Sequence, residues 1–178
     1  IWGWSVGGGA MALAGVVITI YGLSVAIRPE PWWMPRYALP LLGMILGNTM
    51  TGVALGLEAL TGALRRERAA VEAQLLLGRT RADAFRPQVR RALRAGFTPI
   101  INAMAATGVV ALPGMMTGQI LSGVAPEEAV KYQLLIMFLI GGATGLGVLA
   151  AVLGAVRRLS DDRHRLRLDR LSAARAGM

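Results

Sequence analysis

Cysteine is absent from this chain of 178 residues, and histidine occurs once, as His164. The absence of cysteine excludes disulfides, iron–sulfur clusters, cysteine-ligated zinc and thiol catalysis. A single histidine excludes an HExxH motif and any metal site built from several histidines. Charged residues are also scarce, at 16%, whereas apolar residues make up 54% and the mean hydropathy is +0.53. This leaves too little polar surface for a water-soluble domain, so the composition predicts a membrane protein.

The sequence also lacks the signatures of common catalytic sites. No phosphate-binding loop of the form G-x-x-x-x-G-K-[ST] occurs, so the chain has no cradle for ATP phosphates. No nucleophile–base pair or metal triad is evident, and we predict neither an enzyme nor a cofactor held by this chain. The net charge of +9 lies in clusters between apolar stretches. We therefore expect a lipid bilayer, and no nucleic acid, as the surrounding partner.

Four apolar stretches are long enough to cross a membrane, because about 20 helical residues span a hydrocarbon core of roughly 30 Å. They cover residues 4–27, 38–64, 95–123 and 132–156. Nothing alternates with the two-residue period of barrel strands. The predicted fold is all-α: a polytopic transmembrane helical bundle that forms one domain over 1–178. Glycines four residues apart, such as Gly43 and Gly47 or Gly52 and Gly56, indicate close packing of these helices.

Basic residues are concentrated in two segments, 65–94 and 157–178, which hold 16 of the 19 Arg and Lys. By the positive-inside rule, both segments should face the cytoplasm. The chain starts at Ile1 inside an apolar stretch, without the basic start of a signal peptide. We expect N-terminal spans to precede it.

The segment 65–94 is long for a connection between two spans. It predicts a short helix over about 67–77 that ends at a glycine cap, Gly78. Thr80 and Asp83 then have the spacing of a capping box that opens a second helix, and Pro87 should kink or restart that helix. The result is a helical elbow at the membrane surface, with an apolar tip made of Leu75, Leu76 and Leu77.

The alternative for this segment is a basic loop that lies on lipid headgroups. In the elbow model, we expect Arg90 and Arg91, which follow Pro87, to meet headgroups.

Polar residues inside the spans are the candidates for a translocation path. The predicted set is Asn48, Glu58, Asn102, Pro113, Met115, Met116 and Gln119. Glu58 is the only ionisable residue within a span, and intramembrane acids mark substrate paths by default. A structural or interfacial role for this acid is the alternative.

Pro113 should break the third span near residue 113, because a straight helix of that length would exceed the membrane thickness. A simple kink for packing is the alternative. Met115 and Met116 are soft ligands that suit Cu(I) better than iron, and packing is their alternative role. The metal ligands, if any, stay unknown from the sequence.

Several motifs carry a resemblance to a known family. Glu72 and Ala73, followed six residues after the glutamate by Gly78, resemble the EAA loop of ABC-transporter permeases, although Gln74 replaces the second alanine. GMILGNTM at 43–50, LPGMMTGQ at 112–119, AVKYQ at 129–133 and RHRL at 163–166 occur in the order seen in FetB-type permeases. The chain resembles this family, which also contains plant aluminium-tolerance permeases, from about residue 38 to 171.

The resemblance implies the permease subunit of an ATP-driven ABC exporter for metal ions such as iron. Such a subunit works as a homodimer in the bacterial inner membrane, with ATP and Mg bound by separate ATPase subunits. The elbow would dock on the ATPase through Glu72, Ala73, Leu75, Leu76, Leu77, Gly78, Arg79 and Arg81. The rival interpretations are a secondary transporter driven by an ion gradient and a non-transporting membrane scaffold.

Overall fold

A computed structural model describes residues 2–27, 35–107 and 114–160, and every element within these ranges is helical. The elements are α1 (Trp2–Tyr21), its π-helical continuation η1 (Gly22–Ile27), α2 (Pro35–Arg66), α3 (Arg68–Leu76), α4 (Arg81–Ala106), α5 (Gly114–Leu121) and α6 (Pro126–Leu159). The all-α prediction is therefore confirmed for the described part of the chain.

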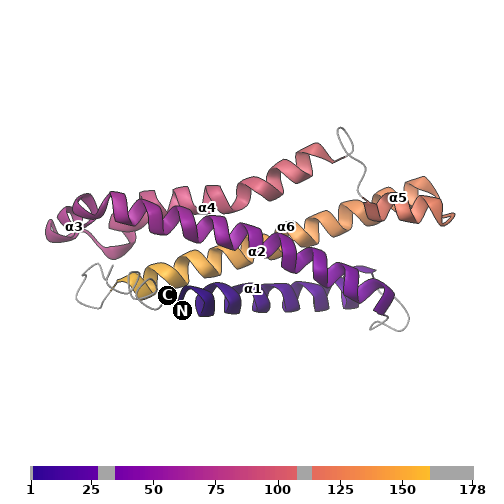
Figure 1. Ribbon diagram of the computed structural model, residues 1–178, viewed down its shortest axis with the longest axis horizontal. Coiled ribbons are helices and arrows are strands. Elements are labelled where there is room, and N and C mark those ends of the chain that lie inside the picture. The colour runs from indigo at the N-terminus through magenta and orange to yellow at the C-terminus, as the bar shows by residue number, and fades with distance from the viewer. Residues whose placement is uncertain (1, 28–34, 108–113, 161–178) are drawn as a thin grey trace, which may run out of the picture.

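Two long helices, α2 and α6, form the centre of the bundle (Figure 1). Both contact α1 on one side and α4 on the other, and α5 packs on α6. Successive long helices run antiparallel, so that α2 and α6 are parallel to each other and their ends lie together with α3 and the start of α4 (Figure 1). We call this the basic end, because arginines from all of these elements meet there. The opposite end holds α5 and the beginnings of α2 and α6 (Figure 1).

The core lies where the two central helices face each other. Near the basic end, Leu60 and Leu64 of α2 pack with Val152 of α6. Toward the other end, Ile45 of α2 packs with Ile136 of α6. All five side chains are essentially inaccessible to solvent.

Helices α2 and α4 meet through bare backbone. A Cβ placed on Gly96 would lie 2.8 Å from the carbonyl oxygen of Gly52, and a Cβ on Gly52 would lie 2.9 Å from the carbonyl oxygen of Gly96. Only glycine permits this close approach of two helix backbones. Gly52 belongs to the predicted pair Gly52 and Gly56, so close packing at this pair agrees with its spacing. The other pair in α2 plays no such part, since a Cβ on Gly43 or Gly47 would have no neighbour within 4 Å.

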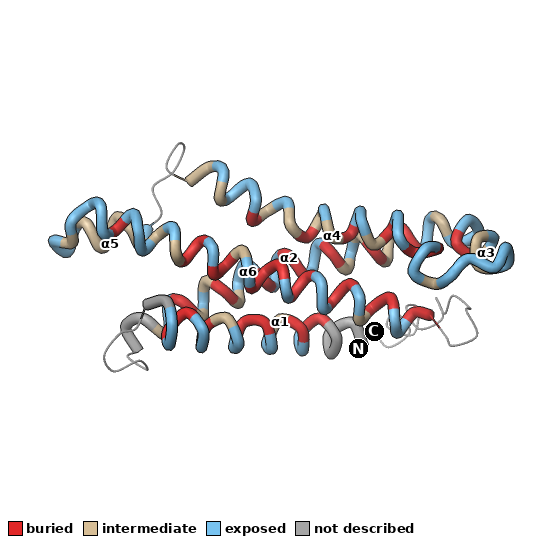
Figure 2. The backbone as a smooth tube through the Cα atoms, turned by 180° about the vertical axis from the view of Figure 1, so that it is seen from behind, coloured by how far each residue is buried: buried red, intermediate tan, exposed pale blue. Residues whose placement is uncertain are grey.

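The outer faces of the bundle are apolar, and Figure 2 shows their exposed positions in blue along α1 and α6. Leu13 of α1 is 69% exposed and Phe138 of α6 is 67% exposed. Side chains of this kind lose the favourable free energy of burial when they face water, about 1.5–3 kcal/mol each. In the described residues, three helical segments have the length and apolarity of a membrane span: Gly7–Val25, Ala38–Arg66 and Pro126–Leu159. Lipid is therefore the natural surrounding of these faces.

The predicted span at 95–123 is not one helix. Helix α4 ends at Ala106, where Thr107 turns to an extended conformation (φ −67°, ψ 131°), and α5 begins at Gly114. The interval between these two helices includes the predicted break position, and the role of Pro113 in the break stays a prediction. Pro113 itself lies outside the described residues. The first half of α4 belongs to the elbow, so the apolar part of this helix is short.

Candidate functional site

The elbow is built as the sequence predicts. Helix α2 ends at Arg66, Glu67 leaves helical geometry (φ −108°, ψ 22°), and α3 follows at once. At the end of α3, Gly78 adopts a φ of +80°, a conformation that L side chains rarely take. Its amide donates to the carbonyl of Leu75, and the amide of Arg79 donates to that of Gln74, both at 3.1 Å. The glycine cap is therefore confirmed.

The second helix of the elbow begins with the predicted cap. The hydroxyl oxygen of Thr80 accepts a hydrogen bond from the amide of Asp83 at 3.3 Å, and the same hydroxyl donates to the Asp83 carboxylate at 2.6 Å. Pro87 does not restart the helix, because α4 continues through it from Arg81 to Ala106. Pro87 is the seventh residue of α4, beyond the first four amides that lack an intrahelical partner, so it removes the hydrogen bond to the Asp83 carbonyl. The predicted kink at Pro87 stays a prediction.

The three leucines of the elbow tip have different surroundings. Leu75 is half-buried and packs against the core cluster at the basic end. Leu76 is 88% exposed and Leu77 is 82% exposed. Among the large apolar side chains of the described residues, only Leu121, at 83%, is comparably exposed. The sequence treated the three as one tip, but only the last two form an exposed apolar pair at the surface of the basic end.

The remaining residues of the predicted docking set surround this pair. Glu72 binds Arg68 one turn earlier, with 2.8 Å between Nε and Oε1. Ala73 and Arg79 are exposed, and Arg81 is half-buried. The docking role of this set stays a prediction, and Leu75 alone among the three leucines packs against the core.

A charged clamp that the sequence did not reveal joins the two sides of the elbow. Arg91 of α4 donates two hydrogen bonds to the Glu67 carboxylate, at 2.6 and 2.5 Å, and the amide of Gln88 donates a third at 2.8 Å. The bonds from Arg91 and then Gln88 hold the pKa of Glu67 below its ordinary value of 4.5. The bond to Glu67 raises the pKa of Arg91. A bidentate arginine–carboxylate pair also restricts the geometry of its partners.

Arg91 is thus paired with an acid although its side chain stays 50% exposed, and Arg90 is exposed as well. Their contact with lipid headgroups stays a prediction. The clamp partners are 21 and 24 residues apart. The three-residue spacing of Gln88 and Arg91 places them on one helix face, but only the fold of the elbow brings Glu67 opposite that face.

The predicted path residues of α2 and α4 lie on outer faces of the described structure. Asn48 is exposed, and its amide donates to the Met44 carbonyl one turn earlier at 2.8 Å. Glu58 is exposed as well and lies ten residues nearer the basic end, about 15 Å along α2. Asn102 is exposed near the end of α4, where α4 diverges from the bundle (Figure 1). None of the three lines either of the two cavities described below.

The path residues of α5 are half-buried. Met115 packs against the core cluster of α2 and α6, which favours the packing role over a ligand role. Met116 and Gln119 lie on the same short helix. In the described residues, no group of three or more His, Cys, Asp or Glu side chains could hold a metal ion. The path prediction therefore gains no shared site from the described structure.

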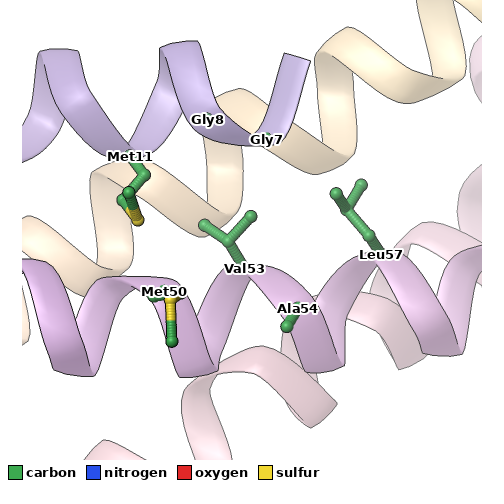
Figure 3. Close-up of a pocket in the computed structure, with 7 residues that line it drawn as sticks. All are labelled: Gly7, Gly8, Met11, Met50, Val53, Ala54 and Leu57. Atoms are coloured by element: carbon green, nitrogen blue, oxygen red, sulfur yellow. The ribbon is translucent and has the colours of Figure 1, made fainter. Parts of the chain in front are cut away.

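A groove of about 490 Å³ lies between α1 and α2 (Figure 3). Its lining is apolar and consists of Gly7, Gly8, Met11, Met50, Val53, Ala54 and Leu57. None of these side chains carries a charge or a strong hydrogen-bonding group, so the groove offers no ligand set for a hard cation such as iron. None of the predicted path residues lines it.

Two hydroxyl groups at the centre of the bundle are notable. Thr49 of α2 and Thr144 of α6 are 0% and 1% exposed, and neither hydroxyl oxygen has a hydrogen-bond partner in the described structure. Each threonine methyl group packs on a glycine of the facing helix, Thr49 on Gly147 and Thr144 on Gly52. The packing of these methyl groups between α2 and α6 therefore explains why both threonines are buried.

Long antiparallel helices with apolar outer faces and a charged elbow at one end define a polytopic helical membrane protein. The chain belongs to the family described as "Uncharacterised protein family (UPF0014)", which matches residues 2–160. The predicted resemblance to FetB-type permeases is thereby confirmed, since FetB is among the relatives.

The chain is 40% identical over 146 residues to "UPF0014 membrane protein slr1647" of Synechocystis sp., a match that covers 82% of this chain and 56% of that protein. It is 36% identical over 137 residues to "Protein ALUMINUM SENSITIVE 3" of Arabidopsis thaliana, covering 76% and 50%. It is 31% identical over 153 residues to "Probable iron export permease protein FetB" of Escherichia coli, covering 86% and 58%. The chain thus spans about half the length of the curated relatives it matches. No solved structure matches it significantly.

Proposed function

We propose that this chain is part of the permease subunit of an ATP-driven exporter of metal ions such as iron, coupled to a separate ATPase subunit. The observation that carries the proposal is the exposed leucine pair, Leu76 and Leu77, at the tip of a capped helical elbow. An apolar centre within a polar, solvent-accessible rim is the usual arrangement of a protein–protein interface. The name of the FetB relative supplies the class of cargo.

The elbow is suited to transmit force. Glu67 sits where α2 passes into α3, and its bonds to Gln88 and Arg91 connect that point to α4. A push on α3 from below would therefore move the ends of two bundle helices together. We propose that this motion changes which side of the membrane the path opens to. The ATP and Mg that drive it would belong to the ATPase subunit.

The basic end then faces the cytoplasm of a bacterial inner-membrane protein, in accord with its arginines. The third membrane crossing would be made by the apolar part of α4 together with α5, giving four crossings. Two copies of the permease would combine with two ATPase subunits, as in the family that the sequence resembles.

The exposed leucine pair provides the test. Leu76→Asp combined with Leu77→Asp places charges where an apolar contact is expected, and burying an unpaired charge is strongly unfavourable. The variant should insert normally but fail to co-purify with the ATPase subunit and fail to stimulate its ATP hydrolysis. Leu121→Asp is the matched control, because Leu121 is 83% exposed at the opposite end. Wild-type coupling in the double variant would exclude the elbow as the coupling element.

A secondary transporter is the second candidate, favoured by the presence of Glu58 on the membrane-spanning part of α2. It requires this acid to bind and release a proton or cation in each cycle. Glu58→Gln would then abolish transport while ATPase depletion would not affect it. The ABC mechanism predicts the opposite pair of results.

A further inference from the structure

The basic end contains a cavity of about 250 Å³ between the start of α4 and the end of α6. Three arginines line it, Arg81 and Arg86 from α4 and Arg157 from α6. Within the described ranges, none of the three guanidinium groups takes part in an ion pair. The acid nearest in sequence, Asp83, is hydrogen-bonded to Thr80. Three converging positive charges without a described counter-ion favour an anionic ligand.

The floor of the same cavity is apolar. Phe85 and Val156 are buried, and Leu153 is 45% exposed. Leu153 lies four residues before Arg157, about 6 Å nearer the middle of α6, and Phe85 is likewise one turn inward from Arg81 on α4. Since Leu153 belongs both to the cavity and to the exposed apolar face of α6, the floor is continuous with the lipid-facing surface.

We propose that this cavity binds an anionic phospholipid, with the headgroup phosphate among the arginines and an acyl chain over Leu153. Arginine pairs with phosphate through two parallel hydrogen bonds. Its long stem also lets the charge reach headgroup level while its methylenes cover apolar surface. A free phosphate ion would satisfy the arginines but leave the floor unfilled, and an acidic protein segment would not explain the continuity with the lipid-facing surface.

The test is native mass spectrometry of the chain purified in mild detergent and titrated with dioleoyl phosphatidylglycerol or dioleoyl phosphatidylcholine. We compare the wild type with Arg86→Gln combined with Arg157→Gln. The matched control is Arg90→Gln combined with Arg94→Gln, which removes the same charge from exposed positions of α4 outside the cavity. Each cavity arginine should contribute about fivefold to the affinity for the anionic lipid, so the cavity variant should bind about 25-fold more weakly. The control variant should bind within about twofold of the wild type.

Binding of phosphatidylglycerol that exceeds that of phosphatidylcholine and is lost only in the cavity variant supports the proposal. Equal binding of the two lipids, or equal losses in both variants, would overturn it. Competition by millimolar inorganic phosphate at the affinity of the lipid would identify a free-anion site instead. Loss of ATPase-subunit association in the cavity variant, with unchanged lipid binding, would identify a protein contact and would also refute it. None of these results depends on transport activity.

Discussion

The contact between Gly52 and Gly96 permits a sharp test of the bundle geometry. In Gly96→Ala, the added methyl group would lie 2.8 Å from the Gly52 carbonyl oxygen and 2.7 Å from Cγ1 of Val148. Ordinary contacts of a Cβ begin at 3.4 Å. The valine can turn, but the carbonyl belongs to the backbone of α2. The substitution therefore forces α4 away from α2, and we expect it to destabilise the protein.

Two effects of opposite sign determine the size of this change. Overpacking of a filled interior costs about 1–3 kcal/mol, whereas alanine is better than glycine in a helix by about 1 kcal/mol. Gly47→Ala isolates the second effect, because Gly47 lies in the interior of α2 with no atom near its missing Cβ. The difference between the two variants therefore reports the packing term alone, about 1–3 kcal/mol.

The assay is thermal unfolding of both variants in the same detergent, followed by circular dichroism. For a chain of this length, 1 kcal/mol corresponds to about 2–4 °C in melting temperature. Gly96→Ala should melt about 2–12 °C below Gly47→Ala, and Gly47→Ala at or slightly above the wild type. If the two variants melt at the same temperature, α2 and α4 do not approach each other through these glycines, and the described packing is refuted.

Three further predictions concern the elbow. The hydrogen bonds of the clamp lower the pKa of Glu67 from 4.5, so the clamp should be complete above about pH 4.5 and be lost as the pH falls through the lowered pKa. Glu67→Gln should remove this acid-dependent loosening, measured by spin-label distances between α3 and α4. Arg91→Gln should loosen the elbow already at pH 7. Gly78→Ala should lower the free energy of unfolding by about 1–2 kcal/mol, because φ is +80° at this position. It should also increase hydrogen exchange in α3, and unchanged exchange would contradict the cap. Single cysteines at Arg79 and Glu127 should differ in labelling by an impermeant thiol reagent on intact cells, with only position 127 reacting; the reverse pattern would invert the proposed orientation.

Part of the elbow was predictable because its signals are local. A glycine cap after Leu77 and the Thr80–Asp83 box depend on residues within one turn of each other, and the structure contains both. The clamp was not predictable, since Glu67 meets Gln88 and Arg91 only after the chain has reversed direction.

The path residues show the corresponding limit in the membrane. The sequence shows that Asn48, Glu58 and Asn102 are polar residues within apolar helices. It does not show whether each side chain faces a neighbouring helix or the outside, because that depends on how the helices pack. The described structure places all three on outer faces.

The sequence by itself determined that this is a helical membrane protein, because long uncharged stretches cannot be solvated by water and their backbone must be satisfied within each helix. It also determined where the elbow turns, because caps are short-range. Helix packing, in contrast, sets which glycines bear a helix contact, which leucines stay exposed, and which arginines line one cavity. Those outcomes depend on the rotation of each helix about its axis and on contacts between residues far apart in the chain, and the free energy of such packing is shared among several helices at once.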